Sequence, residues 1–179
     1  MIIPLSEAIK INEDIYPEDL DAFESMVREL TNNNFQDTKV RVTNVSFEVP
    51  DRITIHTGDL TGFRVNDTIE VTGSTYNDGL YVIVAINENT FIVKGTETLI
   101  SSSSNNAMIT LVKYPPDIKR GVKKLIQYDK KMADKVGIKS ETISRMSKTY
   151  YDVNASENIE GYPASLLSFL DKYKKMRWG

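Results

Sequence analysis

The sequence predicts an α+β protein, with a small helical bundle domain built from both chain ends and an antiparallel β-barrel or sandwich module inserted between them. Apolar residues recur at helical spacing in residues 1–38 and 114–179. Between these parts, residues 39–113 form short runs rich in Val, Ile, Thr and aromatic residues, separated by turn residues. A compact insertion is tolerated when its own two ends lie close together, and a small antiparallel barrel meets that condition.

The N-terminal part predicts a helix that begins at Pro17, because proline suits the first helical position and acidic residues follow at the positive end of the helix dipole. One apolar face has residues spaced three and four apart: Leu20, Phe23, Val27 and Leu30. The sequence TNNN at 31–34 ends this helix. A shorter helical piece is expected to begin at Ser6, which suits an N-cap.

The middle part predicts six short strands. They cover residues 39–49, 52–58, 67–73, 80–86, 90–95 and 107–113. The run Asn77-Asp78-Gly79 favours a tight turn, and SSSSNN at 101–106 predicts a flexible loop. Short antiparallel strands of this number imply a small barrel or sandwich.

The last part predicts two helices. The first follows Pro115 and Pro116 and covers residues 117–136, with an apolar side and Lys-rich other faces. The second begins at Pro163, and its predicted buried stripe contains Leu166, Leu167, Leu170 and Tyr173. The connection from Gly137 to Pro163 has neither a helical stripe nor clean strand alternation, and is expected to lack regular structure.

Composition excludes several classes of site. The chain has no Cys and a single His, His56, so disulfides, Cys-ligated metals and multi-histidine metal sites are excluded. The N-terminus lacks the basic-then-apolar order of a signal peptide, and no apolar run approaches the ~20 residues that span a bilayer. These features predict a soluble protein made in the cytoplasm, with no membrane partner.

Charge is distributed unevenly along the chain. Residues 1–38 carry nine acids and two bases, and residues 114–179 carry eight acids and fourteen bases, which gives −7 and +6. Residues 39–113 carry eight acids and six bases. The opposite charges favour docking of the two ends, within one chain or between neighbouring chains, unless they simply form solvated helix faces.

Motifs that carry chemistry are weak, so the sequence predicts no enzyme, no metal and no cofactor. His56 has no neighbouring partner motif for general-base chemistry. The acids at 13–21 lack the spacing and glycine of a calcium loop, and the glycines at 58, 62 and 73 do not make a phosphate loop. A nucleic-acid-binding module that uses the β-barrel and the Lys-rich helix remains an alternative.

The region between the last two helices carries the most distinctive pattern. It contains Gly137, Ile138, Ser140, Glu141, Ile143, Ser147, Thr149 and Tyr150, and then Tyr162 and Pro163 open the last helix. With the Pro-flanked helix before it, this pattern resembles the C-terminal half of the head–tail connector (adaptor) proteins of long-tailed bacteriophages and prophages. The N-terminal helix resembles that family more loosely. The run VTGSTYNDGLYVIVAINENTFIV is similar to small β-barrel modules inserted in phage structural proteins, whereas the shortest connectors are nearly all helical.

The resemblance implies a structural virion protein at the head–tail interface, without enzymatic activity and made in the host cytoplasm. It would form a ring beneath the portal protein, expected to follow the portal's twelve-fold symmetry. That ring would join the DNA-filled head to the stopper or tail-completion protein and extend the channel for double-stranded DNA.

Two sets of residues follow from this reading. The expected inter-subunit or channel-facing positions are Glu141, Arg145, Lys148, Tyr150 and Tyr151. The expected portal contacts are Lys172, Lys174, Lys175, Arg177 and Trp178, the last because a tryptophan is a common interface anchor.

Overall fold

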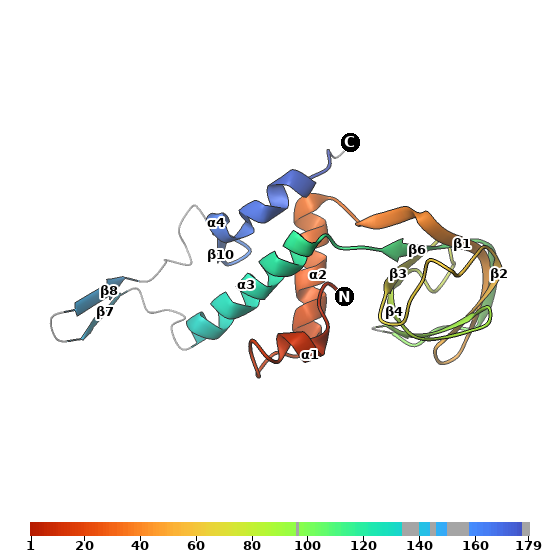
Figure 1. The fold of residues 1–179 in the computed structure, drawn as a ribbon, viewed down its shortest axis with the longest axis horizontal. Helices are drawn as coiled ribbons and strands as arrows, with labels where there is room; N and C mark the ends of the chain where they lie inside the picture. Colours follow the sequence, from red (N-terminus) through yellow and green to blue (C-terminus); the bar gives the residue numbers. More distant parts are fainter. Residues whose placement is uncertain (96, 134–139, 144–145, 150–157, 177–179) are drawn as a thin grey trace. The chain divides into compact units, whose positions relative to one another are not determined.

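The computed structural model describes residues 1–95, 97–133, 140–143, 146–149 and 158–176. Its chain divides into two compact units. The terminal unit contains Met1–Asn33 and Tyr114–Gly179, and the barrel unit contains Asn34–Lys113. The molecule therefore has both helices and strands, as an α+β fold requires (Figure 1).

The barrel unit is a closed antiparallel barrel with strands in the order β1-β2-β5-β4-β3-β6. The strands are β1 (Gln36–Glu48), β2 (Arg52–Thr57), β3 (Thr68–Thr72), β4 (Gly79–Asn87), β5 (Thr90–Gly95) and β6 (Ser102–Val112). All six predicted strands are confirmed, and the barrel form of the prediction is the one observed. Strand β1 is long because it pairs with β2 on one side and β6 on the other, with register shifts that let it curve.

The interior of the barrel holds the alternate apolar residues of each strand. They are Val42, Val45, Phe47, Ile53, Ile55, Ile69, Val71, Tyr81, Ile83, Phe91, Val93, Ala107, Ile109 and Leu111, and they are joined by Phe63 and Leu99 from the connections between strands. Most aromatic residues of this unit are therefore core residues, whereas Tyr76 is 65% exposed. Because these rings are buried, they do not form a surface on which nucleic-acid bases could stack.

The predicted flexible loop at 101–106 is wrong. Residues from Ser102 onward belong to β6, and Ser102, Ser103 and Ser104 pair with Phe47, Ser46 and Val45 of β1. Strand preference depends on the partner strand as much as on composition, so a serine-rich segment extends beside a long neighbour.

The two ends of the barrel unit are adjacent. Gln36 at the start of β1 pairs with Val112 at the end of β6, and the Lys113 amide donates to the Phe35 carbonyl (2.9 Å). A chain that enters and leaves at one place can be inserted between two segments of another unit.

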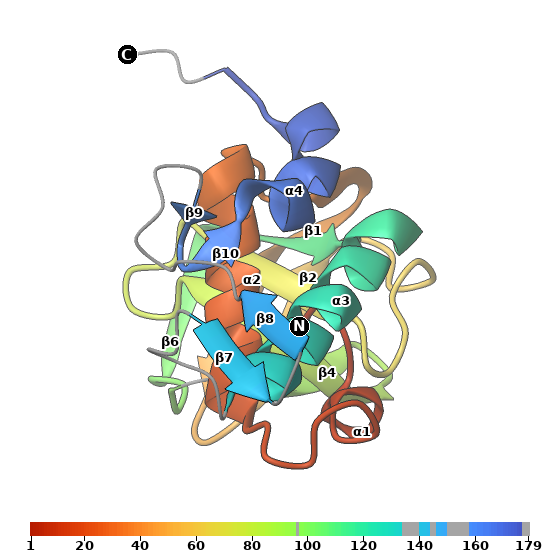
Figure 2. The same ribbon diagram turned by 90° about the vertical axis from the view of Figure 1, so that its left-hand side faces the viewer.

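The terminal unit contains α1 (Leu5–Ala8), α2 (Pro17–Thr31), α3 (Pro116–Met132), α4 (Ala164–Leu167) and the 3₁₀ helix η2 (Ser168–Tyr173). The start of α2 at Pro17 is confirmed, and the helix ends at Asn32 in a left-handed conformation (φ 48°). Helix α1 begins one residue before Ser6, with Pro4 as its N-cap, so the predicted capping by Ser6 is wrong. Figures 1 and 2 show α3 and α4 beside α2 within this unit.

The core of the terminal unit joins the apolar stripes of its helices. Its buried members are Ile2, Ile3, Ala8, Ile15, Leu20, Phe23, Val27, Tyr114, Ile118, Val122, Leu125, Ile126, Leu167 and Leu170. Helix α3 also has Gly121 on this side, where the Phe169 ring of η2 lies so close that a Cβ would come within 2.3 Å of it.

The end of the chain differs from the prediction in two ways. The expected single helix is a short α4 that tightens into η2, a common way for a helix to end, and Leu167 and Leu170 are buried while Leu166 and Tyr173 are half-buried. The connection expected to be irregular contains short antiparallel pairs: β7 (Ser140–Ile143) with β8 (Met146–Thr149), and β9 (Asn158–Ile159) with β10 (Tyr162–Pro163). Glu160 and Gly161 both have positive φ (51° and 81°), which matches a two-residue hairpin turn.

Candidate functional site

The first set of expected contact residues lies in and beside the β7–β8 hairpin. Glu141 of β7 and Lys148 of β8 are register partners. Arg145, Tyr150 and Tyr151 lie outside the described residues. Among the described strands, β7 and β8 pair with each other only.

The second expected set lies in the C-terminal segment. The Lys172 ammonium pairs with the Asp117 carboxylate at the start of α3, and Lys174 pairs with Asp171 (2.7 Å). Lys175 uses its backbone amide, which donates to the Thr31 carbonyl (2.8 Å). The side chains of Lys172 and Lys174 are nonetheless 62% and 52% exposed, so both can still meet a partner. Arg177 and Trp178 lie outside the described residues.

Asparagines at the end of α2 hold this segment in place. The Nδ2 atoms of Asn32 and Asn33 donate to the carbonyls of Met176 (3.3 Å) and Tyr173 (3.2 Å). The Tyr173 hydroxyl donates to Oδ1 of Asp117 (2.5 Å). Lys172 and this hydroxyl together lower the pKa of Asp117 to about 2. The exposed lysines therefore project from an anchored segment.

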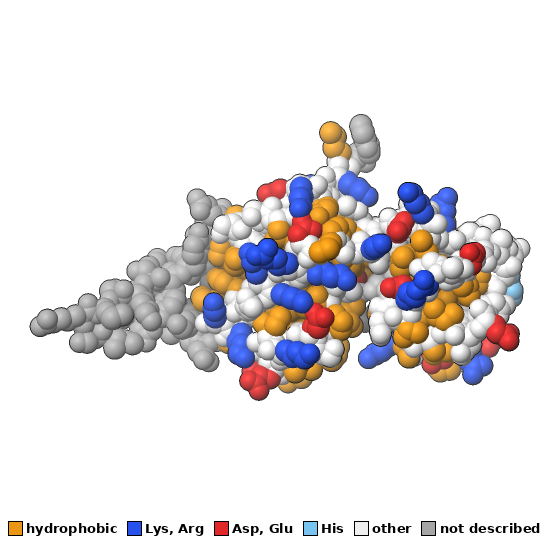
Figure 3. All heavy atoms as spheres, viewed as in Figure 1, with side chains coloured by type: hydrophobic (Ala, Val, Ile, Leu, Met, Phe, Trp, Pro, Cys, Tyr) orange, Lys and Arg blue, Asp and Glu red, His pale blue; other side chains and the backbone are white. Residues whose placement is uncertain are grey.

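Some acidic residues of the N-terminal part form ion pairs with basic residues of α3 within the terminal unit. Lys123 of α3 pairs with Glu7 (2.7 Å), and Lys130 approaches Glu13 (3.9 Å). Both pairs are exposed, and such pairs contribute little stability. The outer side of α3 keeps the exposed cations Lys119, Arg120, Lys124 and Lys131, and Figure 3 shows many basic side chains over this unit.

Glu24 is a buried carboxylate that was not predicted from the sequence. Glu24 of α2 is 3% exposed, accepts a hydrogen bond from the Tyr114 hydroxyl (2.8 Å) and lies 2.6 Å from the Met1 ammonium. Burial lowers the pKa of that ammonium, and burial together with the Glu24 charge raises the pKa of Tyr114. A signal existed, because the buried residues Leu20, Glu24, Val27 and Thr31 share one helical stripe.

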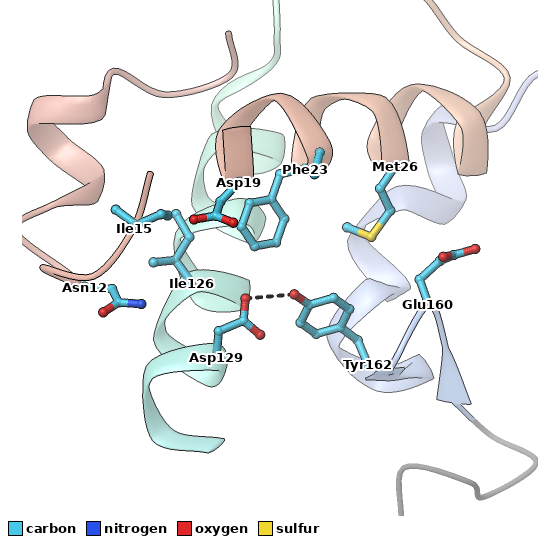
Figure 4. A pocket seen from close by; sticks show the side chains of 10 residues that line it. Asn12, Ile15, Asp19, Phe23, Met26, Ile126, Asp129, Glu160 and Tyr162 are labelled. Carbon is cyan, nitrogen blue, oxygen red and sulfur yellow. Dashed lines mark hydrogen bonds between the residues drawn. The ribbon is translucent and has the colours of Figure 1, made fainter. Parts of the chain in front are cut away.

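A second feature missed from sequence is a cavity of about 370 Å³ within the terminal unit. The residues that line it are Asn12, Ile15, Asp19, Ala22, Phe23, Met26, Ile126, Asp129, Glu160 and Tyr162. Figure 4 shows the Tyr162 hydroxyl bound to the Asp129 carboxylate, and it donates to Oδ2 at 2.8 Å. Burial, with the nearby Asp19 charge, raises the pKa of Asp129 against the opposing effect of that bond. Burial and the Asp129 carboxylate raise the pKa of Tyr162.

The barrel gives His56 a partner that sequence spacing did not reveal. Its Nε2 lies 2.5 Å from Oγ of Ser46, across the β1–β2 pair. Both side chains lie on the outside of the barrel, where His56 is exposed. Nucleophilic catalysis needs two further features: a third group that orients the base, and donors that stabilise an oxyanion. We therefore interpret the Ser46–His56 contact as a hydrogen bond between the side chains of neighbouring strands.

Within the described part of the chain, no group of His, Cys, Asp and Glu is placed to hold a metal ion. The helices of that same part are too short or too polar to cross a bilayer. No protein-family model matches the sequence. A search of curated proteins also finds no match.

Proposed function

We propose that this chain is a head–tail connector subunit of a long-tailed phage or prophage, acting by assembly rather than catalysis. Subunits form a ring beneath the portal, join the filled head to the stopper or tail, and line an extension of the DNA channel. In this proposal the terminal unit is a helical bundle built from both chain ends, and the barrel is its inserted module.

The observation that carries the proposal is the β7–β8 hairpin. It occupies the segment where the sequence resembles connectors most specifically, and its strands pair only with each other among the described residues. A two-stranded hairpin is marginally stable by itself. Strand addition to an open edge by a neighbouring subunit supplies backbone hydrogen bonds, and a ring needs such a head-to-tail contact between two different surfaces.

The C-terminal segment supports a portal contact. It presents exposed lysines and Met176, which is 79% exposed, from a backbone anchored on the end of α2. An anchored surface loses less conformational freedom on binding than a free tail. We assign Lys172, Lys174 and Lys175 to this contact, together with Arg177 and Trp178.

Electron microscopy of the full chain mixed with the portal of its own phage tests the proposal. The expected image is a ring stacked on the tail-facing end of the portal. Lys175→Glu should weaken that binding, while Lys94→Glu makes the same charge change on the barrel and should not. Failure to bind the portal, with stable monomers at high concentration, contradicts the proposal.

A nucleic-acid-binding module is the second candidate, favoured by the exposed cations on the outer side of α3. Binding through phosphates weakens steeply with salt because counterions are released. Tight, strongly salt-dependent binding of DNA by the isolated chain, lost in a Lys119→Gln/Lys124→Gln variant, supports this candidate. Absence of such binding removes it.

A further inference from the structure

The cavity between α2, α3 and the β9–β10 turn has the dimensions of a small ligand site. Its volume of about 370 Å³ lies at the lower end of the range typical of ligand pockets, roughly 300–1,000 Å³. Its lining combines apolar side chains with carboxylates. The proposed connector function does not involve this cavity.

The apolar part of the lining comes from buried residues. Ile15, Phe23 and Ile126 are 7%, 6% and 0% exposed, and Met26 is half-buried beside them. This part can hold an alkyl stem, because contact with it removes the apolar surface of the stem from water.

The charged part of the lining is acidic. Asp19 of α2, Asp129 of α3 and Glu160 of the hairpin turn are carboxylates, and no Lys or Arg is among the described residues that line the cavity. Figure 4 shows the Asp19 and Asp129 side chains on the same side of the pocket, with Glu160 on the opposite side beside Met26. A half-buried carboxylate beside another carboxylate is stabilised by a cation placed between them.

Tyr162 fixes the position of the central carboxylate. Its hydroxyl donates a hydrogen bond to Oδ2 of Asp129. Its ring packs against the rings of Phe23 and Tyr128, with centroid distances of 6.3 and 5.8 Å. One carboxylate oxygen of Asp129 is therefore held by the protein, and the group is oriented before any ligand arrives.

We propose that this cavity binds a cationic alkyl group, an alkylammonium or alkylguanidinium, with the stem on Ile15, Phe23 and Ile126 and the charge between Asp19 and Asp129. Two sources share this chemistry: a free amine, or the side chain of Lys or Arg in a protein. The proposal is independent of the connector role.

The test uses the full chain and three probes, followed by chemical-shift changes in NMR spectra. The probes are n-pentylammonium, N-acetyl-lysine methylamide and neutral 1-pentanol. n-Pentylammonium should bind, with shifts centred on Phe23, Ile126 and Tyr162, and 1-pentanol should bind at least about tenfold more weakly because it makes no charge-assisted contact. Binding of the blocked lysine as well identifies a side chain as the source, and binding of the free amine alone identifies a small molecule.

Two variants and a control complete the experiment. Asp129→Asn keeps an oxygen acceptor for Tyr162 but removes the charge, and should weaken n-pentylammonium at least about tenfold. Ala22→Leu fills the cavity from an exposed helix position and should also abolish binding. Glu48→Gln removes one negative charge on the barrel and should leave binding unchanged. Equal binding of pentanol and pentylammonium, no binding of either cation, or unchanged binding by Asp129→Asn overturns the proposal.

Discussion

Buried and half-buried polar side chains join segments of the terminal unit that are far apart in the sequence. Glu24 of α2 meets the Tyr114 hydroxyl, ninety residues away, and Asp129 of α3 meets the Tyr162 hydroxyl. A carboxylate removed from water is stable only when partners replace its hydration. These pairs therefore fix which surfaces of the unit pack together.

At Asp129 the raised pKa means that ionisation destabilises the fold. The penalty is absent below the unfolded pKa of 3.8, grows as pH rises toward the raised folded value, and is fully present above it. Asp129→Asn should therefore be more stable than the parent at pH 7, by less than about 1 kcal/mol because the group is half-exposed. Thermal unfolding at pH 7 and pH 3.5 checks this, and a gain that does not shrink at low pH contradicts it.

In the barrel, Asn77 is a residue whose removal should be costly. It is 2% exposed, its Nδ2 donates to the Ile100 carbonyl (2.9 Å) and its Oδ1 accepts from the Ile100 amide (2.8 Å). Asn77→Ala removes both hydrogen bonds to the Ile100 backbone. It should destabilise the barrel by about 1–3 kcal/mol, as measured by urea unfolding. The exposed neighbour Thr75→Ala is the control, expected within about 0.5 kcal/mol of the parent. If the two variants had equal effects on stability, the structural role predicted for Asn77 would be wrong.

Among the secondary-structure elements, α3 organises the terminal unit. It packs against α4 and η2, and it provides the buried residues Ile118, Val122, Leu125 and Ile126. Gly121 lets the Phe169 ring approach the helix backbone, so the glycine is needed for close packing. The acidic N-terminal segment meets the same helix through Glu7 and Lys123.

Gly121→Ala tests this packing. Alanine favours a helix by about 1 kcal/mol over glycine, but its Cβ must displace the Phe169 ring, and such overpacking costs about 1–3 kcal/mol. We expect net destabilisation in urea unfolding, relieved when Phe169→Ala is added. Gln127→Ala, on the exposed side of α3, is the matched control. A stabilised Gly121→Ala variant would show that the ring moves away without cost.

For the whole molecule, the adjacent ends of the barrel determine the modular organisation. Gln36 and Val112 are register partners, and all six strands of the closed barrel belong to the barrel unit. The fragment 34–113 should fold alone and unfold cooperatively, as followed by NMR and circular dichroism. A fragment without dispersed NMR signals would show that the barrel depends on the rest of the chain.

Removal of residues 140–151 addresses assembly. Because the hairpin pairs with no other described strand, the deletion should leave the fold of both units intact, as judged by circular dichroism and NMR. On the proposed function it should abolish ring formation on the portal. A deletion variant that still assembles in electron micrographs contradicts the role assigned to this segment.

The sequence by itself determined the type and place of most elements. Strands β1 to β5 follow from short runs rich in Val, Ile, Thr and aromatic residues between turn residues, and helices α2 and α3 follow from the helical spacing of apolar residues. Both signals are properties of neighbouring residues. Errors occurred where the local signal was weak or a partner decided the outcome: serines that extend β6 beside β1, a last helix that tightens into η2, and short hairpins within a connection that lacks periodicity.

Only the tertiary structure decided the closure of the barrel in the order β1-β2-β5-β4-β3-β6, and the features of the candidate site. The 370 Å³ cavity joins residues from 12 to 162, and the partners of Glu24 and His56 lie on other segments. Such contacts depend on which surfaces meet in space. Local spacing specifies which face of each element is apolar, but contacts across the folded chain select the partner of that face and the polar groups buried with it.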